Sequence, residues 1–263
     1  MLIGALVQGW ILEVMKQNQG IQKHFYLPLY GALYHDYTIF MKTRCYEIPH
    51  LRQKIGVFQD RKHAGQLLAE MLHEWKGSKA IVLAVPSGGI PVAVEVAGIL
   101  DLSLDVAVVS KILLPWTTEA GFGAVGFDGS VWINQEYVNY YRLDQTTIEQ
   151  QTQATLEKVQ RRVKLFRGDR PWPDLQNRPV IVVDDGIAAG STLRVAVQAL
   201  HNTGAGEIIV AVPTAHEESL GRIMNKVDAL YCANIRSGPQ FAVAAAYLRW
   251  DDVDENDAAE MLT

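Results

Sequence analysis

The chain has 263 residues, of which 49% are hydrophobic and 20% are charged, an ordinary globular composition with room for one large or two small domains. The net charge is -5 and no Lys/Arg-rich run is present, so bulk electrostatic attraction to nucleic acid is not expected. With only Cys45 and Cys232, a disulfide framework or a multi-thiolate zinc site is excluded, and a reducing, cytoplasmic location fits.

Residues 1–50 carry no recognisable motif and form an unassigned N-terminal extension. The apolar start, residues 1–15, lacks a basic segment, is interrupted by Gln8 and Glu13, and is too short to span a bilayer. No other apolar run is long enough, so no membrane segment is expected. The aromatic residues between positions 25 and 40 favour a small apolar cap on the main domain, with a lid or dimer contact as the alternative.

A first strand–loop–helix unit follows an amphipathic helix expected at residues 60–75, where apolar side chains recur at three- and four-residue spacing. The apolar run 80–85 predicts a buried strand, and a second helix is expected after the loop. That loop contains Ser87, Gly88 and Gly89 at the strand's carboxyl end. Paired glycines permit the positive φ angles that a ligand-binding loop requires. Taken alone, the loop is equally typical of an ordinary turn.

The middle of the chain is expected to hold a strand, an irregular segment and a long helix. The strand, residues 104–109, ends at Ser110 and Lys111. Residues 112–130 are rich in glycine and proline, and a long irregular segment inside a compact domain is usually functional or disordered. Residues 144–166 predict a polar helix with one apolar stripe and a solvated basic face. That face contains Lys158, Arg161, Arg162, Lys164 and Arg167.

The most informative stretch is V-I-V-V-D-D-G-I-A-A-G-S-T, residues 180–192. Its apolar start predicts a buried strand, which ends in the acid pair Asp184 and Asp185. A loop of mostly small side chains follows, so its backbone N–H groups can approach a ligand. The hydroxyl residues after the loop open a helix whose positive N-terminal dipole favours phosphate. The anionic acid pair suits ribose hydroxyls or a hydrated metal instead, at the edge where open α/β sheets bind ligands.

This stretch resembles the phosphoribosyl-diphosphate (PRPP) signature of type I phosphoribosyltransferases. The resemblance implies that Asp184 and Asp185 are catalytic and hold the ribose 2′- and 3′-hydroxyls. It also implies that the following loop, named here the phosphate loop, wraps the 5′-phosphate. Its residues are Gly186, Ile187, Ala188, Ala189, Gly190, Ser191 and Thr192. The alternative is a generic strand-to-helix turn capped by Ser191, with two surface acids.

By the same resemblance, the loop after residue 85, named here the diphosphate loop, binds the diphosphate of PRPP, often through backbone amides and an unusual peptide bond in relatives. The expected diphosphate-binding residues are Ser87, Gly88, Gly89 and Lys111, although a solvated surface lysine is nearly as compatible with the last. Many relatives have arginine at the position of Ser87. The serine removes a charge that could pair with diphosphate, but its hydroxyl can still donate a hydrogen bond. Residues 112–130 correspond in the family to a mobile hood, made of a strand pair and a loop, that closes over the reacting centre and excludes water.

Residues 207–232 predict a further strand–helix–strand unit. In many relatives the loop after it meets the base or other acceptor, which makes Phe241, and secondarily Tyr247, candidates for an acceptor pocket. Ordinary core or cap packing is the alternative for both side chains. The acidic tail, residues 251–260, is expected to be a solvated terminus.

Strands and helices alternate, which predicts an α/β fold with a mostly parallel sheet flanked by helices. With the resemblance, residues 51–263 are expected to form a phosphoribosyltransferase-like domain with a small hood, its elements within 110–142 and 233–250. The implied reaction transfers the 5-phosphoribosyl group from PRPP to a nitrogenous acceptor and releases diphosphate. The implied cofactor is Mg²⁺, held through the substrate and by the acid pair. The partners are then small molecules, and a homodimer is compatible because dimers are common among relatives.

Two other functions stay open at this point. A non-catalytic sensor of PRPP or nucleotides on the same fold is compatible with Ser87 and with Ala188, since some relatives carry an acid at the latter position as a base for the acceptor. A different phosphate-binding enzyme, such as a phosphoesterase, is disfavoured because no obvious nucleophile or metal-ligand cluster adjoins the loop.

Overall fold

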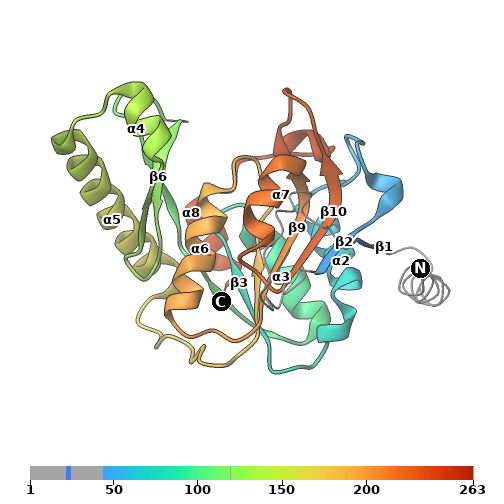
Figure 1. Cartoon of the computed structure of the whole chain (residues 1–263). Helices are drawn as coiled ribbons and strands as arrows, with labels where there is room; N and C mark the ends of the chain where they lie inside the picture. Colours follow the sequence, from blue (N-terminus) through green and yellow to red (C-terminus); the bar gives the residue numbers. More distant parts are fainter. Residues whose placement is uncertain (1–21, 25–43, 119, 263) are drawn as a thin grey trace, which may run out of the picture.

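The computed structural model describes residues 22–24, 44–118 and 120–262. Two sheets organise these residues, a seven-stranded main sheet and a separate three-stranded sheet (Figure 1). The cap, lid or dimer contact considered for residues 25–40 lies outside the described residues. No helix in the described ranges is both long enough and apolar enough to cross a membrane.

The main sheet is mostly parallel, as the sequence predicts. Its strands in spatial order are β1 (Gln22–His24), β2 (Arg44–Glu47), β10 (Ala229–Arg236), β9 (Ile208–His216), β8 (Val180–Val183), β3 (Ile81–Ala84) and β4 (Ser103–Val106). Neighbouring strands run parallel except β1 and β2, which are antiparallel. Because β1 and β2 precede residue 51, this sheet includes residues assigned above to the N-terminal extension.

Helices cover both faces of the main sheet. The helices of the described residues are α2 (Arg61–Met71), α3 (Gly89–Leu100), α4 (Gln135–Tyr141), α5 (Gln145–Arg167), α6 (Ser191–Asn202), α7 (Glu217–Met224) and α8 (Glu255–Glu260), with short 3-10 helices η1 (Pro49–Leu51), η2 (His73–Trp75) and η3 (Val243–Ala246). Of these, α4 and α5 lie beside the small sheet and not over the main one (Figure 1). Side chains alternate along a strand, so Val82 and Ile181 face the cluster formed with α2 and α3. Leu83 and Val182 face the opposite cluster, formed with α6 and α7.

The hood is a small antiparallel sheet of β5 (Ser110–Leu113), β6 (Gly121–Val125) and β7 (Val131–Ile133), beside α4 and α5 (Figure 1). The antiparallel pair β5 and β6 confirms the strand pair that the family resemblance implies for this region, so residues 112–130 are not one long irregular segment. Its glycines serve close strand packing, since a Cβ at Gly123 would lie 2.4 Å from the carbonyl oxygen of Trp132. All three strands lie within residues 110–142, whereas residues 233–236 continue β10 of the main sheet.

The basic face predicted for α5 is only partly solvated. Arg162 and Arg167 are buried, with exposed fractions of 7% and 4%. Arg167 forms two hydrogen bonds with Asp105, of 2.9 and 3.0 Å, and its guanidinium carbon stacks 3.7 Å from the ring centroid of Trp172. The interpretation of both arginines as surface residues is therefore wrong, because each has a buried polar partner that periodicity alone does not reveal.

Replacing Asp105 with Asn should destabilise the protein strongly. Removing one charge of a buried pair leaves the Arg167 guanidinium uncompensated, which costs about 3 kcal/mol. Chemical denaturation should report this loss of unfolding free energy. The matched control is Asp169→Asn, which breaks the exposed Lys164–Asp169 ion pair and should change stability little. Equal effects of the two substitutions would contradict this assignment.

The C-terminal tail also departs from expectation. It forms α8, in which Ala258 is fully buried, and Glu255 pairs with both Arg161 and Arg162 of α5. The nitrogen–oxygen distances of these two pairs are both 2.8 Å. The prediction of a simply solvated terminus is therefore wrong, because Glu255 pairs with two arginines of another helix and Ala258 is buried.

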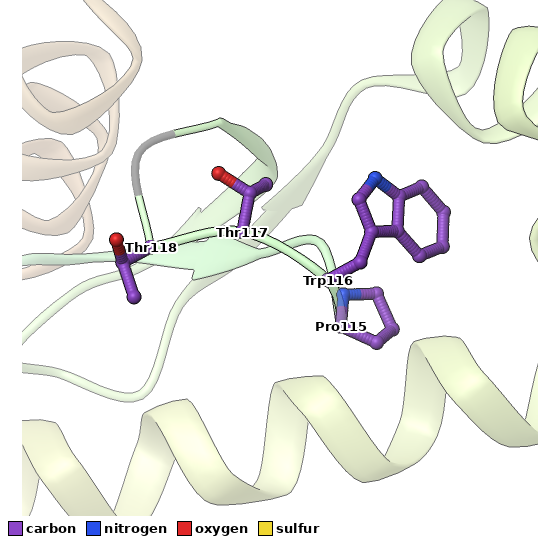
Figure 2. Close-up of a pocket in the computed structure, with 4 residues that line it drawn as sticks. All are labelled: Pro115, Trp116, Thr117 and Thr118. Atoms are coloured by element: carbon purple, nitrogen blue, oxygen red, sulfur yellow. The ribbon is translucent and has the colours of Figure 1, made fainter.

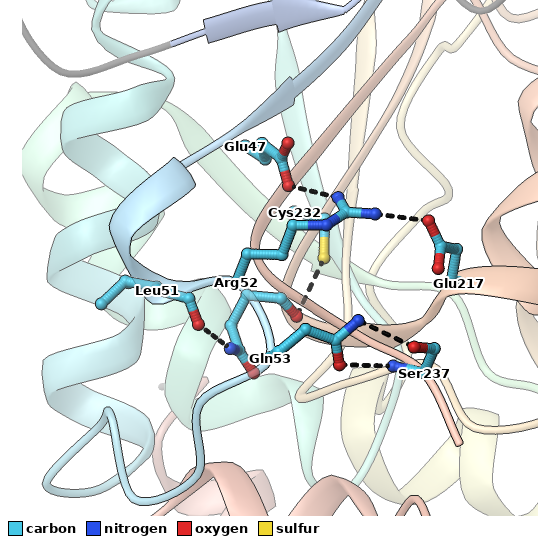
Figure 3. Close-up of polar contacts among 8 residues, drawn as sticks. Glu47, Leu51, Arg52, Gln53, Glu217, Cys232 and Ser237 are labelled. Carbon is cyan, nitrogen blue, oxygen red and sulfur yellow. Dashed lines mark hydrogen bonds and ion pairs between the residues drawn. The ribbon is translucent and has the colours of Figure 1, made fainter. Parts of the chain in front are cut away.

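A polar cluster fastens the segment after β2 to the carboxyl end of β10 (Figure 3). Arg52 donates to Glu47 and to Glu217 at the start of α7. Gln53 accepts from the Ser237 amide and donates to its hydroxyl, at 3.0 and 2.7 Å. This segment therefore borders the same sheet edge as the predicted site.

Candidate active site

The diphosphate loop and the acid pair meet at the carboxyl edge of the sheet. Their strands β3 and β8 are neighbours in parallel register, with Ala84 opposite Val183. The meeting is tight, because a Cβ at Gly88 would lie 2.0 Å from Asp185 Oδ2 and one at Gly89 would lie 2.8 Å from the carbonyl oxygen of Val183.

This close approach corrects the reason given for the paired glycines. Gly88 has φ −59°, an ordinary helical value, and Gly89 opens α3, so neither needs a positive φ. Both positions lack a side chain because the acid-pair strand occupies that space. The Pro86–Ser87 peptide bond is cis, which matches the unusual peptide bond expected from the family resemblance.

The acid pair is held by a hydrogen bond between its own two residues and by a contact from a distant part of the chain. Asp184 Oδ1 accepts a 2.8 Å hydrogen bond from the Asp185 amide, and the Tyr247 hydroxyl donates to the Asp185 carbonyl oxygen at 2.6 Å. Burial and the neighbouring carboxylate of Asp185 raise the pKa of Asp184 well above its usual range. Burial also raises the pKa of Asp185, although Arg61 opposes this shift.

Arg61, at the start of α2, is a site residue that sequence reasoning missed. Its Nε lies 3.0 Å from Asp185 Oδ2, and its Nη1 donates to the Asp251 carbonyl oxygen at 2.7 Å. Its guanidinium carbon also stacks 3.8 Å from the ring centroid of Trp250. The segment after β10 thus positions a cation against the acid pair, and no local motif marks it.

The phosphate loop presents free backbone donors between two anchors. The Ile187 amide donates to the Thr214 carbonyl oxygen, and the His216 amide donates to the Ile187 carbonyl oxygen, both at 2.9 Å. Ser219 donates to the carbonyl oxygen of Ala188 at the other side. These contacts fix the loop's backbone while its next residues face solvent.

The amides of Ala188, Ala189 and Gly190 have no acceptor among the described residues. Those of Ser191 and Thr192 lie in the first turn of α6, where no intrahelical acceptor is available. Gly190 has φ +77°, a left-handed conformation that glycine adopts at little cost. Five consecutive amides at a helix N-terminus form a ready anion cradle.

Lys111 and Phe241 lie on other elements around this edge. Lys111 is exposed on β5, two residues after Val109, whose carbonyl oxygen accepts from Arg162 at 3.2 Å. Phe241 lies beside the ends of β9 and β10, with its ring centroid 5.3 Å from that of His216. The guanidinium carbon of Arg236 stacks 4.5 Å from the Phe241 ring. The diphosphate-binding role of Lys111 and the acceptor-pocket role of Phe241 remain predictions.

Tyr247 is a buried residue with structural contacts on both sides. It is 6% exposed, packs against Phe58 at a ring-centroid distance of 5.4 Å, and bonds the backbone of Asp185. Separately, an open surface pocket of about 530 Å³ lies at the loop that follows β5 in the hood (Figure 2). Its lining residues are Pro115, Trp116, Thr117 and Thr118.

Comparison with known proteins identifies the family. The family model described as "Phosphoribosyl transferase domain" matches residues 139–246. The crystal structure of TT1426 from Thermus thermophilus is 33% identical, covers 78% of this chain and 97% of its own, and superposes with a TM-score of 0.63. The chain belongs to the phosphoribosyltransferase family.

Two curated Mycobacterium tuberculosis relatives carry provisional names as phosphoribosyl transferases. Each is 34% identical over 206 residues, which is 78% of this chain and 46% of the relative. The chain therefore spans about half the length of the curated relatives it matches.

Proposed function

We propose that this protein transfers the 5-phosphoribosyl group from PRPP to a nitrogenous acceptor and releases diphosphate. The observation that carries the proposal is the contact of Gly88 with Asp185, beside the free amides of the phosphate loop. One sheet edge thus combines a loop for diphosphate, carboxylates for ribose hydroxyls and a cradle for the 5′-phosphate. A generic strand-to-helix turn has no need of this combination.

The reaction is a displacement at C1 of the ribose. The bond from C1 to diphosphate oxygen breaks, and its electron pair leaves with diphosphate. The lone pair of the acceptor nitrogen forms the new bond to C1, and the acceptor then loses a proton. Amides of Ala188–Thr192 hold the 5′-phosphate, so binding energy far from C1 positions the reacting carbon.

The acid pair serves the ribose side of this reaction. Carboxylate oxygens accept hydrogen bonds from the 2′- and 3′-hydroxyls, and their negative field favours the cationic character that develops at C1. The acid pair also fits Mg²⁺, because carboxylate oxygens are the hard ligands that this ion prefers. Oδ1 of Asp184 accepts the hydrogen bond from the Asp185 amide, whereas Oδ2 accepts none from the described residues and is available to a metal. When bound, Mg²⁺ supplies positive charge to the leaving diphosphate.

The sensor remains the second candidate function. It is favoured by Ala188, which offers no carboxylate to take the acceptor's proton, and by Ser87 in place of a charged loop residue. An assay of diphosphate release from PRPP with pooled bases and amines separates the two. Release that depends on an added acceptor supports the transferase, whereas saturable PRPP binding without release supports the sensor.

Replacing Ala189 with Val should damage phosphate binding more than stability. Ala189 is exposed, so folding tolerates a larger side chain, but the added methyl groups crowd the amides on either side. The affinity for ribose 5-phosphate should fall about tenfold, with the thermal midpoint nearly unchanged. Calorimetric titration and thermal denaturation measure the two effects. A variant that loses both equally would mean that the loop is merely structural.

A further inference from the structure

The diphosphate loop has one side-chain donor, Ser87, and a buried cation lies behind it. Arg162, on α5, donates from Nη2 to Ser87 Oγ at 3.2 Å, and from Nη1 to the Val109 carbonyl oxygen at the same distance. The Ser87 residue is partly exposed, whereas the Arg162 side chain is 8% exposed. The cation therefore reaches the loop from within the protein and not from solvent.

The direction of this hydrogen bond determines what the serine can do. A hydroxyl has one proton and two lone pairs. Because Arg162 occupies a lone pair, the Ser87 proton stays available to a ligand on the exposed side. A hydrogen bond from a charged donor also polarises the hydroxyl and strengthens the next bond in the chain.

The positive charge behind the loop is not cancelled by its partner. Glu255 lies 2.8 Å from both Arg161 and Arg162, so one carboxylate is shared between two guanidinium groups. The set keeps a net positive charge while Glu255 orients the arginine side chains. The backbone amides of Ser87 and Gly88 belong to the same loop, and they have no acceptor in the described part of the chain.

We propose that Arg162 is a positioning residue for diphosphate: it fixes and polarises the Ser87 hydroxyl, which then donates to a diphosphate oxygen. The loop thereby gains the effect of a cation from α5, through a neutral side chain. This inference rests on the proposed function, because it requires that diphosphate bind this loop. It gives a role to Arg162, which links α5 to the main sheet edge through Ser87.

The test compares affinities of the full-length chain for two ligands, inorganic diphosphate with Mg²⁺ and ribose 5-phosphate, by calorimetric titration. The substitutions are Arg162→Gln, Ser87→Ala and both together. Each single substitution should weaken diphosphate binding about tenfold and leave ribose 5-phosphate binding within about twofold. The double variant should be no weaker than Ser87→Ala, because the arginine acts through the serine.

The matched control is Arg167→Gln, which removes an equally buried arginine of the same helix that contacts Asp105 and not the loop. It should lower stability without changing the ratio of the two affinities. A purely structural role for Arg162 predicts that Arg162→Gln weakens binding of both ligands equally, and this result would overturn the proposal. Additive losses of diphosphate affinity in the double variant would overturn it as well, because the arginine would then act independently of the serine. Wild-type protein that binds ribose 5-phosphate but no diphosphate also overturns it, whereas binding of neither ligand overturns the proposed function itself.

Discussion

Asp184→Asn should lower kcat/KM with PRPP about 100-fold while leaving the protein at least as stable as the wild type. The substitution keeps the shape of the side chain but removes the negative field beside C1 and one oxygen acceptor for a ribose hydroxyl. Loss of a preorganised electrostatic contact of this kind costs on the order of 100-fold in rate. Steady-state kinetics with saturating acceptor, or PRPP titration where no acceptor is known, measures the effect.

The stability result follows from the raised pKa of Asp184. When folding raises the pKa of a carboxyl group, ionisation opposes folding, so stability falls as pH rises above the ordinary value of 3.8. Asn cannot ionise, and the variant should gain stability relative to wild type as pH rises, in metal-free buffer. The control is Asp251→Asn, an exposed acid whose backbone oxygen alone contacts Arg61. Undiminished PRPP binding by Asp184→Asn would contradict the ribose assignment.

Gly88→Ala should push the diphosphate loop away from the acid pair and so impair both activity and stability. The new Cβ would lie 2.0 Å from Asp185 Oδ2 and 2.7 Å from its Cγ, so the loop or the carboxylate must move. A displacement of about 1 Å at a reacting centre costs on the order of 100-fold in rate. Overpacking should also lower the unfolding free energy by about 2 kcal/mol.

The matched control for this substitution lies in the same helix. Gly98 of α3 is exposed, and a Cβ there would meet nothing within 4 Å. Gly98→Ala should therefore raise stability by about 0.5–1 kcal/mol and leave activity unchanged. If Gly88→Ala keeps full affinity for PRPP, the contact between the diphosphate loop and the acid pair has no role in binding.

The fold and the core of the site could be predicted because their signals are local. The buried strands β3 and β8, each followed by a loop of small residues and a helix, appear as contiguous patterns in the sequence. Parallel neighbours bring their carboxyl ends to one edge, which unites Asp185 with Gly88. The hood strand pair could be expected only from the family resemblance, because its glycines, which permit close packing, also characterise irregular loops.

The supporting residues could not be predicted because their partners are far away in the chain. Arg61 bonds a carboxylate 124 residues later, and Arg162 bonds a hydroxyl 75 residues earlier. Tyr247 and Asp185 are separated by 62 residues. No spacing rule connects such pairs, and the apolar stripe of α5 says nothing about which basic side chains point inward. Tertiary packing alone decides which cations become part of the site.

The most direct test of the account is a calorimetric titration of the full chain with PRPP, with and without Mg²⁺, alongside Asp184→Asn. We expect saturable wild-type binding that strengthens when Mg²⁺ is present and weakens markedly in the variant. The absence of PRPP binding under both conditions, in protein shown to be folded, would contradict the claim that this sheet edge is a phosphoribosyl-diphosphate site.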